Sequence, residues 1–178
     1  MSALERTAHV TFCPYKGDAI EERHEACGNG WKSQEGPMTN VIEKHSISSE
    51  LAQRMVNAVI AKARELGVAE NVAILDDGGN LKAFSRMDGA SIPTIEIAQN
   101  KAYTALFGVP TQDFFDFIQR DPSLLAGIPT LARVAAWGGG LPIKLNGEVV
   151  GAIGVSGAPT VQNDVDCARA ALALVTEP

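Results

Sequence analysis

A glycine-rich stretch near the end of the chain constrains the fold more than any other feature. Residues 137–157 read WGGGLPIKLNGEVVGAIGVSG, in which two apolar runs flank the pair Asn146-Gly147. Both central positions of a type I′ turn need a positive φ, which Asn and Gly tolerate, so this pattern predicts a tight antiparallel hairpin. The fold must therefore contain at least one pair of antiparallel strands.

The residues that follow this hairpin are candidates for ligand contact. A helical pattern begins at about Thr160, and the N-terminus of a helix attracts anionic groups through its free N–H groups and its dipole. Three small residues before this helix leave the backbone uncovered: Gly154, Ser156 and Gly157. We expect the loop that they form to contact a ligand. Asp164, in the first turn of the same helix, is expected to stabilise the helix dipole rather than to act in catalysis.

Composition and charge argue against several function classes. The 178 residues are 46% hydrophobic, which is enough for one domain with a sizeable core. The net charge of −6, without any cluster of Lys or Arg, argues against nucleic-acid binding. No apolar run approaches the ~20 residues of a membrane span, and the first residues lack the apolar core of a signal peptide. We therefore expect a cytoplasmic protein without membrane contact.

The chain is predicted to consist of an irregular N-terminal arm, residues 1–44, and one domain, residues 45–178. The arm contains two of the three cysteines but no sustained periodicity. Cys13, His24 and Cys27 are of zinc-ligand types, but a fourth ligand is not evident and structural zinc sites use tighter cysteine pairs. We therefore predict no metal site, and free thiols rather than a disulfide framework.

Within the domain, the spacing of hydrophobic residues is typical of helices in some segments and of strands in others. The predicted elements are a helix from Ser48 or Ser49 to Gly67, strands at 71–76 and 81–87, a helix at 92–108 capped by Ser91, a short helix from Thr111 that Pro122 interrupts, a strand at 131–136, the hairpin, and a helix at 160–175. Asp76 and Asp77 are interpreted as residues of the first turn. This order is typical of an α+β domain, whereas a Rossmann fold alternates strands and helices throughout.

Motifs of several common enzyme classes are missing. The glycines of residues 151–157 have the spacing GxxGxxG, which differs from the dinucleotide-binding fingerprint GxGxxG, and the chain contains no Walker A motif. It also contains no GxSxG or HExxH sequence of a hydrolase. The function must therefore be sought in other residues.

Five motifs follow one another along the domain. They are NVAILDDGGNL (71–81), RMDGA (86–90), KAYTA (101–105), GGLP (139–142) and GAIGVSG (151–157). In this order they resemble the signatures of the GlcG/HbpS family, a domain that also forms the C-terminal part of PduO, and the resemblance covers residues 48–175. It implies a profilin-like three-layer α/β/α sandwich with a five-stranded antiparallel sheet, usually assembled into oligomers.

The resemblance implies more than one function. Some members of the family bind haem, others accompany glycolate or diol catabolism, and lyases acting on hydroxylamino-aromatics such as 4-hydroxylaminobenzoate are similar. We predict a small-molecule catabolic protein, a cofactor-free lyase or isomerase of a carboxylate-bearing compound. The alternative is a non-catalytic protein that binds haem or another tetrapyrrole.

The haem alternative depends on an axial ligand. The three histidines, His9, His24 and His45, all precede the part of the chain that resembles the family. The candidate ligands are His45 and, as weaker ones, Tyr103, Met55 and Met87. A solvated role for His45 and ordinary core packing for the two methionines are the favoured interpretations.

Lys101 is the first candidate for a catalytic residue. On the predicted helix it shares a stripe with Ile97 and Thr104, apart from the stripe that faces the sheet. A lysine among partly apolar neighbours can bind an anionic ligand, or act as a base if burial lowers its pKa, although an ordinary salt bridge is the alternative. Tyr103 and Thr104, beside it in the sequence, are candidates for substrate contact.

Arg86 is the second catalytic candidate. It lies at the end of a predicted strand, and its planar guanidinium suits bidentate recognition of a carboxylate. Asp88 follows two residues later, so the alternative is that the two side chains pair and brace the next turn.

The helix at 92–108 also predicts assembly. Ile97, Phe107 and the stripe through Thr104 leave more apolar surface than one face of a sheet can bury. We expect a partner subunit to cover it, in a homodimer or a higher even-numbered assembly with the ligand pocket near the interface.

Overall fold

The computed structural model describes residues 42–175 of the chain. Its elements are α1 (Ser49–Leu66), β1 (Asn71–Asp76), β2 (Leu81–Arg86), α2 (Thr94–Ala105), α3 (Thr111–Ile118), α4 (Pro122–Gly127), a 3₁₀ turn η1 (Ile128–Thr130), β3 (Gly140–Leu145), β4 (Glu148–Ser156) and α5 (Val161–Leu172). The four strands form one antiparallel sheet in the order β2-β1-β4-β3. His9 and the zinc-type residues Cys13, His24 and Cys27 lie outside the described residues.

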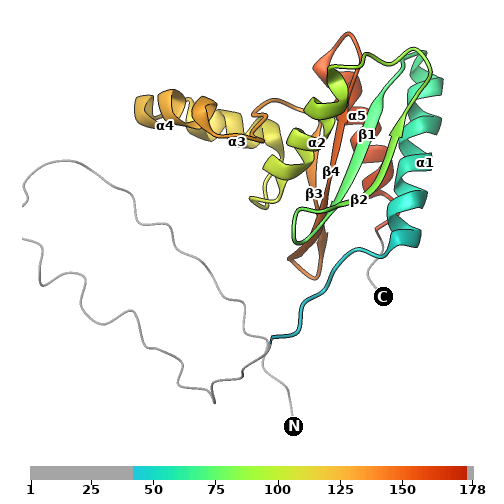
Figure 1. Ribbon diagram of the computed structural model, residues 1–178, viewed down its shortest axis with the longest axis horizontal. Coiled ribbons are helices and arrows are strands. Elements are labelled where there is room, and N and C mark those ends of the chain that lie inside the picture. Colours follow the sequence, from blue (N-terminus) through green and yellow to red (C-terminus); the bar gives the residue numbers. More distant parts are fainter. Residues whose placement is uncertain (1–41, 176–178) are drawn as a thin grey trace, which may run out of the picture. The chain divides into compact units, whose positions relative to one another are not determined.

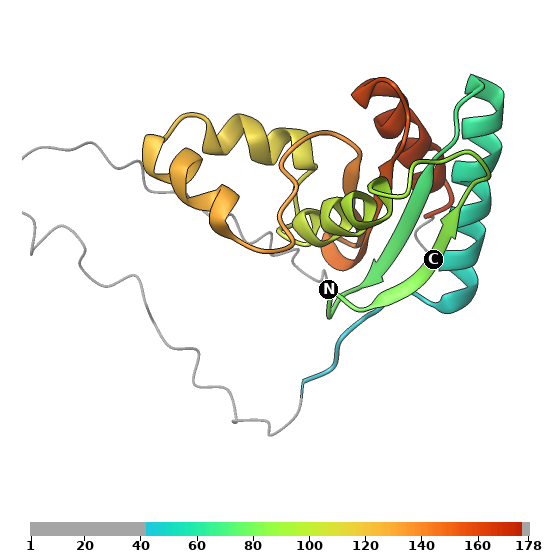
Figure 2. The same cartoon turned by 45° about the horizontal axis from the view of Figure 1, so that its top comes forward.

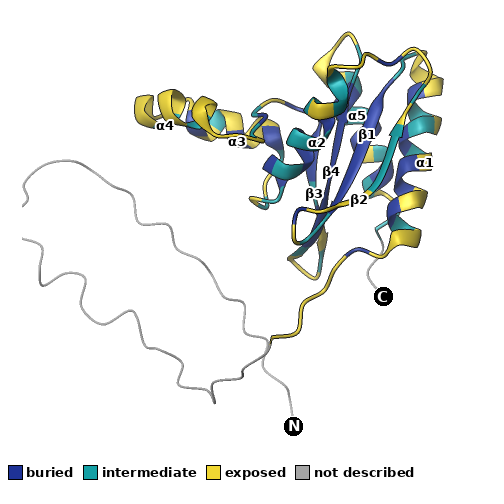
Figure 3. Ribbon diagram, in the orientation of Figure 1, coloured by how far each residue is buried: buried dark blue, intermediate teal, exposed yellow. Residues whose placement is uncertain are grey.

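Helices cover both faces of this sheet. α1 and α5 pack side by side on one face and α2 packs on the other (Figure 1). The buried residues lie along the strands and on the sheet-facing sides of these helices (Figure 3). α3 and α4 lead away from the sheet, as a second view also shows (Figure 2). The α+β class and the three layers are as predicted. Among residues 42–175, no helix is both long and apolar enough to cross a membrane.

The prediction of a fifth strand is wrong for the part of the chain that the structure describes. Residues 131–136, expected to be a strand, form a loop between η1 and β3. Arg133 has a φ of 64°, which no strand residue adopts. The Ala135 N–H donates to Thr104 Oγ1 on α2, at 2.9 Å, rather than to a neighbouring strand. This apolar run therefore anchors a loop to α2.

The helix ends follow local signals in most cases. Ser48 Oγ accepts a hydrogen bond from the Leu51 N–H at 3.1 Å, and Gly67 ends α1 with a φ of 69°. Thr160 caps α5 in the same way. The expected capping of α2 by Ser91 is wrong, because the helix begins at Thr94 and no side chain caps it. Its C-terminal end is also earlier than predicted, at Ala105.

Both hairpins form as predicted. Asn146 and Gly147 have φ values of 51° and 82°, the positive values that a type I′ turn requires. In the first hairpin, the Asp76 carboxylate accepts hydrogen bonds from the Gly78 and Asn80 N–H groups at 3.0 and 2.9 Å. Asp76 therefore acts as a turn residue.

Glycines let α2 approach the sheet closely. A Cβ atom at Gly154 would collide with the Ala98 carbonyl oxygen and the Ala102 nitrogen of α2, and one at Gly140 would collide with the Lys101 backbone. Gly154 consequently lies within β4, beneath α2, and not in the loop expected from the sequence. This close packing brings the Lys101 side chain to the C-terminal end of β4.

Candidate functional site

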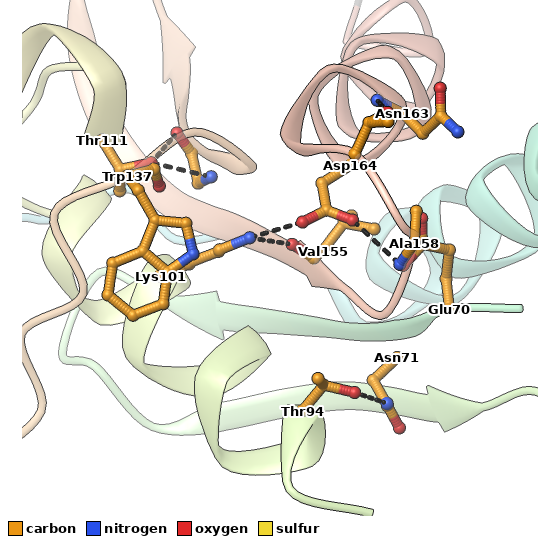
Figure 4. Close-up of polar contacts among 12 residues, drawn as sticks. Glu70, Asn71, Thr94, Lys101, Thr111, Trp137, Val155, Ala158, Asn163 and Asp164 are labelled. Carbon is orange, nitrogen blue, oxygen red and sulfur yellow. Dashed lines mark hydrogen bonds and ion pairs between the residues drawn. The ribbon is translucent and has the colours of Figure 1, made fainter. Parts of the chain in front are cut away.

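A buried ion pair lies where α2, α5 and the end of β4 meet. Lys101 of α2 is fully buried, and its Nζ donates to Asp164 Oδ2 of α5 at 2.6 Å and to the Val155 carbonyl oxygen of β4 at 3.0 Å (Figure 4). The Trp137 ring lies on another side of the ammonium, with its centre 5.8 Å from Nζ. Three elements distant in sequence therefore enclose one lysine.

A second buried carboxylate completes this group. Glu70, just before β1, is fully buried, and its Oε2 accepts a hydrogen bond from the Ala158 N–H at 3.0 Å. The same N–H is 3.3 Å from Asp164 Oδ1, so one donor serves two carboxyl groups (Figure 4). Glu70 Oε1 has no hydrogen-bond partner within residues 42–175. We call Glu70, Lys101 and Asp164 the buried triad.

Burial sets the electrostatics of the triad. Burial, and after it the negative charge of Asp164, raise the pKa of Glu70 to about 8. Burial lowers the pKa of Lys101, although the negative charges of Asp164 and Glu70 oppose this. Burial also raises the pKa of the nearby Cys167 thiol, on α5, to about 12. The triad can therefore hold a different number of protons than three such groups in water.

A glycine turn separates the triad from a pocket. Gly139 has a φ of 114°, and a Cβ atom there would lie 2.6 Å from the Val155 carbonyl oxygen and 2.8 Å from Lys101 Nζ. Both the conformation and the lack of space therefore require glycine. Only the backbone of this residue fits beside the ammonium.

Gly139 also lines a pocket of about 460 Å³. The other lining residues come from α3, β3, α5 and the turns before them: Pro110, Gln112, Asp113, Gly138, Gly140, Leu141, Val161, Gln162, Val165, Arg169 and Leu172. Arg169 and Asp113 are the charged members of this lining and are both exposed. Within residues 42–175, Arg169 forms no ion pair. Its guanidinium can therefore receive an anion.

Thr111 holds the glycine turn in place. It is fully buried at the start of α3, and its Oγ1 accepts a hydrogen bond from the Gly140 N–H at 3.0 Å. The same hydroxyl donates to the Trp137 carbonyl oxygen at 2.6 Å. Thr111 belongs to no sequence motif, and its only distinguishing feature in the sequence is its place at the start of a predicted short helix. Thr111 fixes the pocket wall rather than contacting a ligand.

Several of the predicted substrate-binding residues are buried or already bonded to other parts of the protein. Thr104 Oγ1 accepts from the Ala135 N–H and donates to the Asn100 carbonyl oxygen at 2.8 Å. Ser156 is buried at the end of β4. Gly157 does lie in the predicted loop, but a Cβ atom there would lie 2.9 Å from Glu70 Oε2, so this glycine faces the triad.

The remaining candidates lie apart from the triad. Tyr103 is covered by the Arg133 guanidinium, 3.9 Å from its ring centre. Arg86 is exposed, and its guanidinium donates to the Ala90 carbonyl oxygen at 3.4 Å. It lines a depression beside α1 that shares no residue with the Gly139 pocket. His45 is exposed, and its Nδ1 lies 2.9 Å from Glu148 Oε2.

Metal ligands do not gather in the described part of the chain. Among residues 42–175, no group of three His, Cys, Asp or Glu side chains has the geometry to hold a metal ion. The polar centre of this domain is therefore the buried triad and the pocket beside it. Fold and site together define a small three-layer α+β domain with buried ionisable groups behind a glycine-lined pocket.

Comparison with known proteins gives the family. The model of the family described as "Haem degrading protein HbpS-like" matches residues 47–173, and the chain belongs to this family. A 15.0 kDa protein of the dhaT–dhaS intergenic region of Citrobacter freundii is 40% identical over 134 residues, which are 74% of this chain and 94% of that protein.

Solved structures agree with this assignment. Klebsiella pneumoniae protein ORFY is 35% identical, with a TM-score of 0.73, over 78% of this chain and 97% of that one. A protein solved as a PduOC:haem complex is 28% identical, with a TM-score of 0.67, over 73% of this chain and 95% of that one. The resemblance to the GlcG/HbpS family inferred from the five sequence motifs is thereby confirmed.

Proposed function

We propose that this protein binds a small organic anion, a carboxylate above all, in the Gly139 pocket and acts on it by proton transfer, as a lyase or isomerase. The observation that carries the proposal is the position of Gly139, which lines the pocket and has Lys101 Nζ directly behind it. The volume of about 460 Å³ falls within the range of small-molecule sites.

The charged residues of the pocket suggest the kind of ligand. Arg169 replaces Arg86 as the expected carboxylate anchor, because it lines this pocket and its planar guanidinium suits a carboxylate. Asp113 offers a hydrogen-bond acceptor in the same lining. A ligand with a carboxylate at one end and an N–H or O–H donor at the other matches this pair. 4-Hydroxylaminobenzoate, a candidate from the family resemblance, has this form.

Lys101 supports the proposal through its charge. Its side chain is fully buried, and a charge in the protein interior acts more strongly on an anion than it does in water. Perturbed pKa values of the kind found for Glu70 and Lys101 are typical of groups that transfer protons in catalysis. Lys101 is therefore expected to attract the ligand through the glycine backbone. Its charge is also expected to influence how many protons the site holds.

Calorimetric titration with benzoate and with 4-hydroxylaminobenzoate tests the binding site. Arg169→Gln should weaken binding by roughly 10- to 150-fold, the loss of one charge-assisted hydrogen bond of about 1.5–3 kcal/mol. Arg54→Gln is the matched control, because Arg54 is exposed on α1 and does not line the pocket. Equal affinity of the Arg169 variant and the wild type would reject this anchor.

The reaction needs its own test. Incubation with 4-hydroxylaminobenzoate, followed by chromatography, should show loss of the substrate that depends on the protein. If 4-hydroxylaminobenzoate binds but is recovered unchanged, it is not the substrate, although the proposed binding site is still supported. Other carboxylates with a hydroxyl or amino donor would then be screened in the same way.

Haem binding is the second candidate function, favoured by the relative solved as a PduOC:haem complex. Haem iron needs an axial ligand such as His, Met, Cys or Tyr. The lining of the Gly139 pocket contains none of these residue types. Within residues 42–175 the one histidine, His45, is exposed and bonded to Glu148, and Met55 is buried in the core. The described residues therefore do not fit haem in this pocket.

Absorption spectroscopy separates the two functions. Haem titrated into the protein should give no saturable Soret shift at one haem per chain if the pocket serves a small anion. A stoichiometric shift that His45→Ala abolishes would favour the haem alternative. A shift that benzoate competes away would place haem in the Gly139 pocket and overturn the order of the two functions.

A further inference from the structure

The two carboxyl groups of the buried triad are arranged as partners. Glu70 and Asp164 face the same Ala158 N–H, at 3.0 and 3.3 Å, and a single N–H cannot satisfy two carboxylates. Glu70 Oε1 has no partner in the described residues, although the side chain is fully buried. With all three groups ionised, the triad would carry one uncompensated negative charge in the interior, which is costly. A proton on the carboxyl pair removes this charge.

We propose that Glu70 and Asp164 share one proton, and that an anion in the Gly139 pocket binds to this protonated triad in preference to the deprotonated one. The inference rests on the proposed binding of an organic anion and extends it. Glu70 is then a positioning residue that sets the charge behind the pocket. In alkaline solution the protein takes up an anion and a proton together.

A continuous path of contacts connects the proton to the pocket. Asp164 contacts the same Ala158 N–H as Glu70 through Oδ1 and holds Lys101 Nζ through Oδ2. Lys101 Nζ lies beside Gly139, and Gly139 also lines the pocket. When Glu70 is protonated, the positive Lys101 and the negative Asp164 balance. When Glu70 loses its proton, the triad carries a net charge of −1 and repels an anion.

The charged and titratable groups that face Glu70 come from α5, α2 and the loop after β4. From α5, Asp164 and Cys167 face it, and from α2, Lys101 acts on it, while the loop after β4 contributes the Ala158 N–H. Burial keeps the Cys167 thiol protonated, with a pKa of about 12, across the pH range used below. The pKa of about 8 for Glu70 agrees with a proton that is lost in mildly alkaline solution.

Infrared spectroscopy of the wild-type protein detects the proton without any ligand. A protonated carboxylic acid has a C=O band distinct from that of a carboxylate. This band should persist at pH 6–7, where exposed carboxyl groups are ionised, and disappear as the pH rises through about 8. Glu70→Gln should abolish the band, whereas Glu65→Gln, a change at an exposed carboxylate of α1, should leave it. A wild-type spectrum without the band at pH 6–7 would overturn the proposal.

Calorimetry with benzoate then tests the coupling. When a unit charge and a bound anion lie roughly 12 Å apart in a medium with an effective dielectric constant of about 20, the charge changes the affinity for the anion about tenfold. Wild-type affinity should therefore fall about tenfold between pH 7 and pH 9.5. At pH 8.5–9, heats measured in two buffers of different ionisation enthalpy should reveal proton uptake. Glu70→Gln, which keeps the shape of the side chain, should bind benzoate at every pH without proton uptake, and Glu65→Gln should behave as the wild type.

The outcomes separate this inference from the proposed function. Benzoate binding that is independent of pH, with the infrared band present, would overturn the coupling but leave the pocket intact. Failure of benzoate to bind at any pH would reject the proposed function, while the infrared titration alone would still decide whether the carboxyl groups share a proton. If Glu70→Gln fails to fold, the wild-type band and the wild-type proton uptake still support or overturn the inference.

Discussion

Replacement of Lys101 by Met tests whether the buried ion pair is as enclosed as the structure indicates. Methionine approximates the length of the lysine chain but removes the ammonium, so Asp164 would remain buried at 4% exposure without its partner. Removing one member of a buried pair typically costs about 3–5 kcal/mol. A domain of this size is stable by roughly 5–15 kcal/mol, so the variant should fold but with much of its stability lost.

A double substitution separates the charge effect from packing. Lys101→Met combined with Asp164→Leu removes both charges and replaces them with apolar groups, a change that is often neutral or stabilising in other proteins. We expect the double variant to recover most of the stability that the single variant loses. Urea denaturation followed by circular dichroism at pH 7 measures the free energy of unfolding for each protein in the cycle.

The chain provides its own control. Lys62 pairs with Glu65 at 3.0 Å on the surface of α1, and the Glu65 side chain is 68% exposed. Lys62→Met should therefore change the free energy of unfolding by less than about 1 kcal/mol. A loss below 1 kcal/mol for Lys101→Met as well would show that water reaches the triad, and the argument from burial would fail.

Three further predictions follow from the structure. Glu70 has a pKa of about 8 in the folded protein and an ordinary value of 4.5, so the folded state binds more protons between these pH values. The free energy of unfolding should therefore fall as the pH rises through this range, by at most about 5 kcal/mol. Glu70→Gln should flatten this pH profile, measured by urea denaturation. Gly139→Ala should destabilise by about 1–3 kcal/mol and abolish benzoate binding, whereas Gly127→Ala, in open space on α4, should leave both unchanged or slightly improve stability. Light scattering at micromolar concentration should give the mass of a dimer or a larger even-numbered assembly. The reason is that apolar side chains remain exposed on and beside α3, with Phe107 at 62% and Phe117 at 49% exposure. Phe117→Glu should lower the measured mass, and a wild-type monomer would contradict the prediction.

Local signals in the sequence were sufficient for most of the fold. Ser48, Gly67 and the Asn146-Gly147 pair act through backbone groups within a few residues, so their effect can be inferred without knowledge of the rest of the chain. The prediction of a fifth strand failed because the conformation of that segment depends on a distant part of the chain. Residues 131–136 have an apolar pattern, but their conformation is fixed by a hydrogen bond to Thr104, about thirty residues away in sequence. Pattern alone does not distinguish a strand from an apolar loop that contacts a helix.

The candidate site was predicted only in part. Lys101 was identified by its place on a helix face, and a salt bridge was one of its expected roles, but its partner is 63 residues further along the chain. Asp164 was assigned to the helix dipole, which its position in the first turn of α5 still allows. Glu70 cannot be recognised from the sequence, because a single glutamate before a strand has no distinguishing pattern. Its role depends on the loop after β4, which only the folded chain brings next to it.

The composition of the triad itself argues for function rather than stability. Well-packed apolar side chains of similar volume would stabilise this junction of α2, α5 and β4 as well as three ionisable groups do, and without an unpartnered oxygen on Glu70. The surrounding glycines carry the same implication, because Gly139 and Gly157 leave space for Lys101 Nζ and Glu70 Oε2 that any other residue would fill. Conformational freedom and buried charge both reduce stability, and both are concentrated beside one pocket. A cost that serves no structural purpose is expected where a charge or a proton is used.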